Sequence, residues 1–490
     1  MKMILRTALL GGMTLLAAGR GYGDTMPEKL SLSRKDAVSM ALSKNVDLRY
    51  ETLNSTMAEK DLAKSRSIYR PVLNASATGG VTSSPGDNFS SKYTTETIGL
   101  TQGLPIGGNV TATYQTGYTN AEILTPGIAP KEWQSSAGVT LSQPLLKNFG
   151  KETTELGITL ADSALKDSQE RLRFTTTDTV FSVVTTYNHL YTQYQVLEAK
   201  KAALKSMQDL LEEVKKRKAG PSQRMEIANA DYAIAQRQKD LVDAYRNLRD
   251  TDANFRYLIG MESKGEIVPI DPPSREEPKI TEDQAVKEAM ELRPDLKQLR
   301  QSLKTSELQE RVSRRQKMPD LTITGGGGIY GTGENIGTPF QQSGSWWSAG
   351  MTFTYPIGNL VAENEYLKNK IKTEQLHYQL KAYEWKIRND VEADLRALIS
   401  ARLQLQTTDK ALQSAEQRHE EYLKHQRAGA ATVQDVINAE NDLNVARNVQ
   451  LDAVEAFAYN VTKLWRDTGE LLDQQGVNFD NFKTGAAAFR

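Results

Sequence analysis

The sequence predicts a mainly α-helical protein with a β-barrel portion. Two tandem repeats each contain a helix, a β-hairpin and long coiled-coil helices. Three observations carry this prediction. The chain matches itself along two ungapped registers, its long helical segments have heptad spacing, and its strand segments alternate between apolar and polar residues. A chain of 490 residues is long enough for two or three domains.

The composition excludes several classes of site and partner. The formal net charge is +0, so the whole chain has no general attraction to nucleic acid. Cysteine is absent, which removes disulfides, thiolate zinc sites and cysteine nucleophiles. The four histidines have no metal-ligand spacing, and His419 and His425 are expected at the solvated surface of a polar helix. Neither Gly-x-Ser-x-Gly nor a phosphate-binding loop occurs, so we expect no enzyme and no cofactor.

The N-terminus has the pattern of a signal peptide. Lys2 and Arg6 precede the short apolar run ALLGGMTLLAA, and small residues follow it. The run is too short to span a bilayer, although an uncleaved N-terminal anchor is the alternative. We expect residues 1–23 to be removed and the mature protein to be exported. Because only helices and closed barrels satisfy their backbone in lipid, the exported protein is either soluble or a β-barrel.

Two registers of self-similarity divide the chain into halves. SRKDAVSMALSKNVDLRY from Ser33 matches TEDQAVKEAMELRPDLKQ from Thr281, at an offset of 248 positions. KKRKAGPSQRMEIANADYA from Lys215 matches KHQRAGAATVQDVINAENDL from Lys424, at an offset of 209 positions. The predicted division is a first repeat over 24–260, a Pro-rich linker over 261–279, a second repeat over 280–470 and a C-terminal tail over 471–490.

Each half has the same order of helices. Ser33 or Thr281 is the expected N-cap of the first helix. Apolar residues in the last helix recur in steps of three and four, which is the period of a left-handed coiled coil. A helix of about 68 residues extends roughly 100 Å, far longer than a compact domain requires. The predicted helices cover roughly 34–68 and 281–316, then 151–218 and 362–427, and after an Ala-Gly break they run to Gly260 and Gly469.

The strand segments alternate with period two. In WWSAGMTFTYP, Trp347, Met351 and Phe353 share one face, and Ser348 and Thr352 share the other. A soluble sandwich would show the same alternation, but the exported context favours a membrane barrel. Four strands in the first half and two in the second cannot close a barrel alone, so the chain must oligomerise. The predicted strands lie near 72–82, 96–105, 109–119, 134–145, 320–330 and 346–356.

The doubled order of elements resembles the TolC family of outer-membrane efflux proteins. The most specific parts are AGAATVQDVINAENDLNVA, the SQPLL corner between strand and helix, and the two registers. The resemblance implies a homotrimer in the outer membrane of a Gram-negative bacterium, with an α-helical barrel extending into the periplasm. It also implies a passive exit duct for efflux or type I secretion, whose partners are a periplasmic adaptor, an inner-membrane pump of the RND or ABC type, and outer-membrane lipid. A soluble periplasmic coiled-coil adaptor is the alternative, and the two full repeats argue against it.

On the family pattern, the two Ala-Gly breaks are helical tips at the inner end of the periplasmic barrel. Two tips per chain give six in a trimer, a pseudo-sixfold ring. Glycine suits a backbone that leaves helical geometry, and basic residues near a helix C-terminus also complement the helix dipole. The resemblance makes the tips an adaptor-docking surface. The residues expected there are Arg217, Lys218, Gly220, Arg427 and Gly429.

The resemblance also implies a narrow aperture near the tips. Asp435 corresponds to an acidic ring in the best-known family members, although an ordinary exposed helix residue would look the same. The family's tyrosine and arginine, which lock the closed duct, are replaced here by Gln426 and Ala431, so this chain departs from the family pattern at the lock. The residues expected at the aperture are Asp435, Asn438, Glu226 and Asn229.

Three tryptophans are candidates for an aromatic girdle at the membrane surface: Trp133, Trp346 and Trp347. Packing inside a loop is the alternative for them. The extra hairpin over 96–119 departs from two strands per half. Either the barrel has six strands per protomer, or this hairpin lies outside the barrel.

Overall fold

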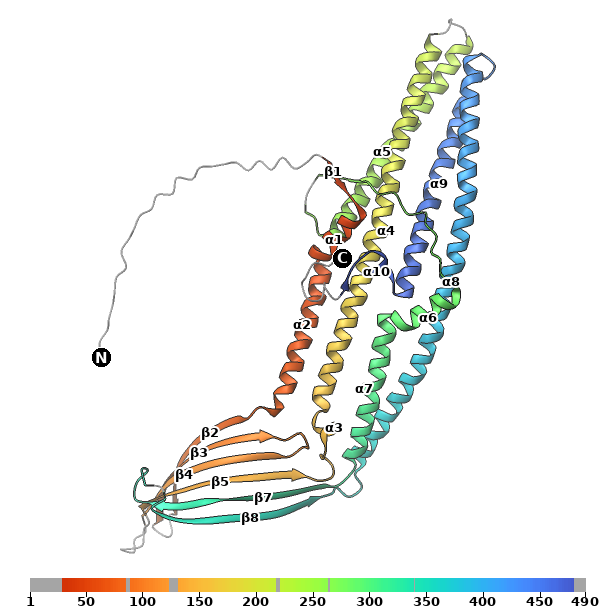
Figure 1. Cartoon of the computed structure of the whole chain (residues 1–490). Coiled ribbons are helices and arrows are strands. Elements are labelled where there is room, and N and C mark those ends of the chain that lie inside the picture. The colour runs from red at the N-terminus through yellow and green to blue at the C-terminus, as the bar shows by residue number, and fades with distance from the viewer. Residues whose placement is uncertain are drawn as a thin grey trace, which may run out of the picture.

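A computed structural model describes residues 29–84, 89–122, 131–216, 221–262, 265–338 and 340–479. The expected signal peptide, residues 1–23, lies outside the described residues. A sheet occupies one end of the molecule, and long helices extend from it to the opposite end (Figure 1). Shorter elements lie beside the middle of these helices. The mainly helical class with a separate β-portion is therefore confirmed.

Six antiparallel strands form one continuous sheet. They are β2 (Val72–Ser84), β3 (Phe89–Gly103), β4 (Asn109–Glu122), β5 (Lys131–Pro144), β7 (Asp320–Gly333) and β8 (Gln342–Thr354). The order is β2-β3-β4-β5-β7-β8, so β5 of the first half pairs with β7 of the second. All the predicted strands are present. The extra hairpin, β3 and β4, lies inside the sheet, and β2 and β8 are its two edges.

The first helix of each half is broken in two, which corrects the expectation of one continuous helix. In the first half, one helix ends at Asn45, where ψ is 129°, and the Asn45 side chain caps the next helix by accepting two backbone N–H groups. In the second half, Pro294 excludes helical geometry at Arg293, whose ψ is 124°. The pieces are α1 (Arg34–Lys44), α2 (Val46–Arg66), α6 (Glu282–Leu292) and α7 (Pro294–Gln316).

Two long antiparallel hairpins form the rest of the helical layer. Their helices are α4 (Leu156–Lys215), α5 (Pro221–Ile259), α8 (Leu360–Arg427) and α9 (Val433–Thr468), with a short α3 (Lys151–Thr154) before α4. α4 packs on α2, α5, α7 and α9, and α8 packs on α7 and α9. Near the sheet, α2 and α8 are therefore the two edges of the layer. Among the described residues, no helix is long and apolar enough to cross a membrane.

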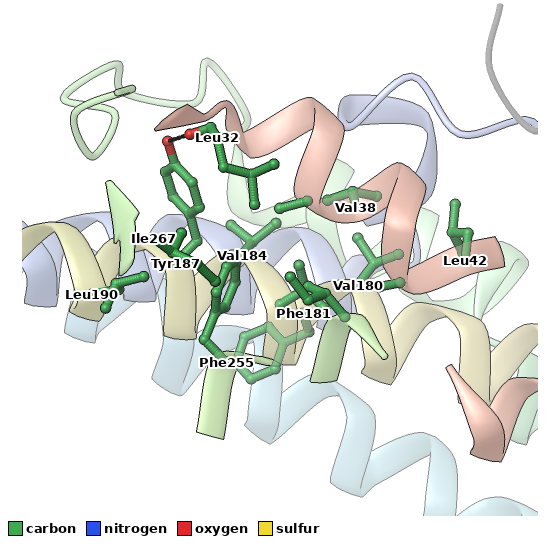
Figure 2. Packing of buried hydrophobic residues seen from close by; sticks show 14 of the residues in the cluster. Leu32, Val38, Leu42, Val180, Phe181, Val184, Tyr187, Leu190, Phe255 and Ile267 are labelled. Carbon is green, nitrogen blue, oxygen red and sulfur yellow. Dashed lines mark hydrogen bonds between the residues drawn. The ribbon is translucent and has the colours of Figure 1, made fainter. Parts of the chain in front are cut away.

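Short elements pack against the middle of α4 and α9. They are β1 (Lys29–Leu32), β6 (Glu266–Pro269) and α10 (Leu471–Gln474). β1 and β6 pair in parallel, so the predicted linker contains a strand. The buried Tyr187 hydroxyl donates to the carbonyl oxygen of Leu32 at 2.9 Å and accepts from the Asp271 N–H at 2.9 Å. Figure 2 shows the hydrogen bond between Tyr187 and Leu32, with the aromatic ring of Phe255 beside Tyr187. One α4 side chain thus anchors both the start of the described chain and the linker.

Candidate functional site

The turn between α8 and α9 forms a helical tip, far from the sheet (Figure 1). Gly429 has a φ of 75°, the left-handed conformation that favours glycine. No described atom lies within 4 Å of a Cβ placed on Gly429, so the turn is open. Arg427 is exposed, and its Nη2 lies 3.5 Å from Oε1 of Glu213 on α4. The residues expected at the other tip, Arg217, Lys218 and Gly220, lie outside the described residues.

Asp435 caps the start of its own helix. Its carboxylate accepts from the Thr432 N–H at 2.9 Å and from the Thr432 hydroxyl at 2.6 Å. The Asp435 N–H donates to Thr432 Oγ1 at 3.2 Å, which completes a capping box. The side-chain and backbone hydrogen bonds from Thr432 lower the pKa of Asp435 below its ordinary value. The carboxylate is therefore charged at neutral pH and stays partly exposed.

The other expected aperture residues lie on the first turns of α9 and α5. Asn438 is exposed, and its Oδ1 accepts from Nε2 of Gln434 at 3.0 Å. Glu226 and Asn229 are half-buried and lie about one turn apart on α5. The polar groups of Asn438, Glu226 and Asn229 therefore lie near the tips and remain at least partly accessible to solvent.

The two hairpins are joined near the tips by an apolar core and polar links that sequence reasoning missed. The core contains Met207, Leu210, Val214, Ala233, Val433, Val436 and Ile437. Ser206 on α4 donates to Oε2 of Glu440 on α9 at 3.2 Å, and Arg237 on α5 donates to Oδ1 of Asn441 on α9. Gln426, at an expected lock position, is fully buried. The heptad pattern indicated each hairpin, but only the fold brings the two hairpins together.

His419 does not lie at the solvated surface, which corrects the expectation from the polar helix around it. Its side chain is 14% exposed, and its Nε2 lies 2.7 Å from Oε2 of Glu440, whose side chain is 5% exposed. A second pair joins His189 on α4 to Glu455 on α9, with 2.8 Å between Nδ1 and Oε1. The hydrogen bond that His189 donates to Glu455 raises the pKa of His189. α9 is therefore held by a His–Glu contact on each side.

A polar network lies where α7 begins and α9 ends. Asp295 accepts from Arg293 Nη2 at 2.7 Å and from the Tyr383 hydroxyl at 2.6 Å. Burial alone would raise the pKa of Asp295, but hydrogen bonds from Arg293 and Tyr383 outweigh it and lower the pKa. Burial and the contact with Asp295 raise the pKa of Tyr383 to about 12. The network fixes α8 against the start of α7.

Asp394 is the most deeply buried carboxylate of this region. It is 2% exposed and forms an ion pair with Lys463, while Lys463 Nζ also lies 4.0 Å from Asp467. Burial, with the neighbouring Asp467, raises the pKa of Asp394 to about 6. This group therefore changes its charge close to physiological pH.

A cavity of about 700 Å³ lies against the network. Five basic and five acidic residues line the cavity, so its net charge favours neither an anionic nor a cationic ligand. They are Arg171, Arg173, Arg293, Lys386, Arg466, Glu51, Asp178, Asp295, Asp390 and Asp467. Among the described residues, no group of three or more His, Asp or Glu side chains could hold a metal ion.

The sheet has one apolar and one polar face. Cross-strand partners lie on the same face, so the pairing register assigns each residue. The apolar face contains Leu73, Ile98, Leu100, Val139, Leu141, Ile323, Ile329, Trp347, Met351 and Phe353, all exposed. The polar face contains Thr97, Thr101, Thr111, Thr113, Ser136, Thr140, Ser348 and Thr352. This division is typical of a membrane barrel with lipid outside and water inside.

The three tryptophans divide between these faces. Trp133 is on the apolar face, where its ring lies 5.3 Å from that of Tyr118. Trp347 is on the same face and is 83% exposed. Trp346 is on the polar face, and its Cζ2 lies 2.5 Å from a Cβ placed on Gly138. Trp346 therefore lies on the face opposite to the one that Trp133 and Trp347 share.

A sheet with one apolar face, continued by paired helices of great length, defines a subunit of a membrane duct. The chain matches the family described as outer membrane efflux protein over residues 129–261 and 285–470. These segments are more than half of the chain, and the chain belongs to this family. Comparison with curated proteins finds no match.

Solved outer-membrane channels have the same fold. The CmeC outer membrane channel of Campylobacter jejuni is 16% identical, with 93% of this chain and 89% of that chain covered and a TM-score of 0.67. The open state of the MtrE outer membrane channel of Neisseria gonorrhoeae is 16% identical, with 89% of each chain covered and a TM-score of 0.64. The outer membrane protein VceC of Vibrio cholerae is 14% identical, with 91% of this chain and 96% of that chain covered and a TM-score of 0.63.

Family membership confirms three expectations from the sequence. The resemblance to the TolC family is confirmed, the protein is located in the outer membrane and extends into the periplasm, and it is an efflux exit duct. The alternative of a soluble periplasmic adaptor is not favoured, because both repeats continue into one six-stranded sheet.

Proposed function

We propose that three copies of this chain close a single passive duct, with eighteen strands in the membrane. The observation that carries the proposal is the pair of unpaired sheet edges, β2 and β8. An open edge with unpaired N–H and C=O groups is costly in lipid, so each edge needs a partner strand. Joining β2 of one copy to β8 of the next is a head-to-tail contact, which closes as a ring. The polar face then lines the water-filled duct.

The helical layer supports the same arrangement. The edge helix α2 has an exposed heptad stripe: Val46, Tyr50, Leu53 and Met57. The opposite edge helix α8 has a second one: Leu360, Leu367, Ile371, Tyr378 and Trp385. Both stripes are exposed in the single chain, and α2 and α8 are the two edges of the helical layer near the sheet (Figure 1). Packing α2 of one copy on α8 of the next buries both stripes.

The helical tips are the proposed contact with a periplasmic adaptor, which in turn joins an inner-membrane pump of the RND or ABC type. The open turn at Gly429 and the exposed Arg427 support this proposal. The first tip has the sequence AGPSQRME and the second AGAATVQD, so a trimer would present two kinds of docking site in alternation. The duct serves efflux or type I secretion and performs no chemistry of its own.

We place Asp435, Asn438, Glu226 and Asn229 at the inner aperture. Three copies of the charged Asp435 carboxylate would attract cations in a confined passage. Trp133 and Trp347 are the proposed members of a lipid-facing girdle, since they share the apolar face.

Photo-cross-linking tests the trimer. A benzophenone amino acid placed at Tyr50 or at Tyr378 is expected to give dimer and trimer bands on denaturing gels of outer membranes. The same probe at Lys279, exposed in the linker, is the control and should give little cross-linking. A monomer band alone from both stripes would contradict the proposed interface.

A further inference from the structure

Basic residues gather where the helices meet the sheet. Five segments form this junction, which we call the basic collar: 64–71, 104–108, 145–153, 311–319 and 355–363. They contain nine basic and two acidic residues, a net charge of +7 in a chain whose net charge is +0. The basic residues are Lys64, Arg66, Arg70, Lys147, Lys151, Arg311, Arg314, Arg315 and Lys317.

The collar also exposes apolar side chains. They lie in turns and helix ends next to the strands, and the side chain of Ile357 is fully exposed. Basic and apolar side chains mixed at the margin of an apolar band are typical of the boundary between hydrocarbon and headgroups. The exposed apolar residues of the collar are Ile68, Ile106, Phe149, Met318, Tyr355, Ile357 and Val361.

Hydrogen bonds tie the collar to the apolar face of the sheet. Gln102 lies on that face, and its amide donates to the Tyr69 carbonyl oxygen, next to Arg70. Gln143 lies on the same face, and its Nε2 donates to the Ile106 carbonyl oxygen at 3.1 Å. The segment from Arg66 to Arg70 and the turn at Ile106 therefore continue the apolar face toward the helices.

Further contacts extend the collar from this turn to α7. The Gly150 N–H donates to the Ile106 carbonyl oxygen at 3.1 Å, and Gln316 Nε2 donates to Asn148 Oδ1 at 3.1 Å. Arg315 Nη2 lies 3.2 Å from Glu152 Oε2. The basic end of α7 is thus in contact with the same continuous surface.

Part of the collar's charge is not neutralised within the chain. Glu152 pairs with Arg311 and Arg315, Glu363 pairs with Lys317, and Lys151 pairs with Glu155, just outside the collar. Arg66, Arg70 and Arg314 are exposed, and the described residues include no ion-pair partner for them. A helix dipole accounts for Arg66 and Arg314, which lie in last turns, but Arg70 lies beyond α2 and the short helix η1 (Ser67–Tyr69).

We infer that the basic collar binds the headgroups of anionic phospholipids in the periplasmic leaflet of the outer membrane. This inference rests on the proposed function, in which the sheet lies in the membrane and the helices extend into the periplasm, so that the collar meets that leaflet. Its guanidinium groups match phosphate oxygens in charge and geometry. Apolar collar residues reach the acyl region beside them. The bound lipids hold the sheet at a fixed depth and concentrate anionic lipid around the duct.

The experiment uses full-length protein in nanodiscs of phosphatidylethanolamine with about one-fifth phosphatidylglycerol. The test variant carries Arg66→Gln, Arg70→Gln and Arg314→Gln. Native mass spectrometry counts the phosphatidylglycerol molecules that stay bound. We expect the variant to retain at least threefold less phosphatidylglycerol than the unmodified protein. High salt should reduce retention by the unmodified protein, because screening weakens exposed charge contacts.

Two controls make the outcome decisive. Lys205→Gln, Arg246→Gln and Lys410→Gln remove the same charge from exposed sites along α4, α5 and α8, and this variant should retain phosphatidylglycerol normally. Arg66→Lys, Arg70→Lys and Arg314→Lys keep the charge and should retain most of the bound lipid. Equal retention by the Gln collar variant and the unmodified protein would overturn the inference. Equal losses of bound phosphatidylglycerol in the collar and control variants would overturn it as well. So would a competition experiment in which lipopolysaccharide is the only added lipid that displaces phosphatidylglycerol.

Discussion

A Cβ placed on Gly469 lies 2.8 Å from the Cβ atom of Leu292, at the point where α9 ends against the last residue of α6. The first repeat contains the equivalent contact, since a Cβ on Gly260 lies 2.8 Å from Cβ of Lys44 at the end of α1. Both glycines have positive φ, 88° and 63°. The two halves therefore share one geometry at the junction of their short and long helices.

Replacing Gly469 with alanine should destabilise the protein, because the new methyl group meets Leu292 and the backbone is left-handed. We expect a loss of about 2 kcal/mol or more in the free energy of unfolding, measured by chemical denaturation with circular dichroism. Gly476→Ala is the control, since Gly476 also has positive φ, 70°, but nothing lies within 4 Å of its Cβ position. Equal losses in the two variants would show that the contact with Leu292 contributes nothing.

Asp435→Asn should weaken block of the channel by multivalent cations. A carboxylate within about 4 Å of an ion contributes about 1 kcal/mol in water, so we expect roughly a fivefold weaker block in single-channel recordings. Thr432→Ala is the control. It removes the capping hydrogen bond, which costs about 1 kcal/mol of helix stability, but keeps the carboxylate. If both variants change the block equally, Asp435 acts only through the helix cap.

Asp394→Asn should change how stability depends on pH. The folded pKa of Asp394 is about 6, above the ordinary 3.8, so the folded state holds this proton more tightly. The associated stability is present below pH 4 and is lost as pH rises through about 6. The asparagine variant lacks this loss, and we expect it to gain about 2 kcal/mol relative to the unmodified protein between pH 4 and pH 7. Parallel stability curves across this range would contradict the assignment.

Glu455→Gln should lower the pKa of His189 toward its ordinary 6.5, because the hydrogen bond that His189 donates to the Glu455 carboxylate raises it. The contact stabilises the fold below pH 6.5, and this contribution is lost as pH rises through the raised pKa. The chain has four histidines, so selective ¹³C labelling can follow each titration by NMR. His377, on α8 and away from Glu455, is the internal control. An unchanged His189 titration would show that the contact does not form in solution.

Local patterns predicted most of the fold. Period-two alternation located the six strands, and the heptads with Ala-Gly breaks located both long hairpins. The breaks at Asn45 and Arg293 do have local signals, a capping residue and a residue before proline. Because the self-similarity of the two halves continues across both positions without a gap, one continuous helix was predicted in each half. Alternation already separated Trp346 from Trp347, although both were included in the expected girdle.

Contacts between distant segments could not be predicted in this way. His419 lies on a polar helix, and its burial depends on Glu440, which reaches it only after α8 and α9 pack together. β6 forms because a proline-rich linker meets β1 more than 230 positions away. The collar is similar, since its basic residues come from three separate segments, 64–71, 145–153 and 311–319, that only the junction of helices and sheet brings together. Each of these features depends on tertiary packing rather than on sequence period.

In the proposed duct, three copies join β2 of each copy to β8 of the next. Single-particle cryo-electron microscopy of the protein extracted from outer membranes tests it most directly. We expect a threefold-symmetric particle in which β2 of each copy pairs with β8 of the next, and α2 packs on the neighbouring α8. A particle with another number of copies, or a map in which β2 and β8 remain unpaired, would contradict the account.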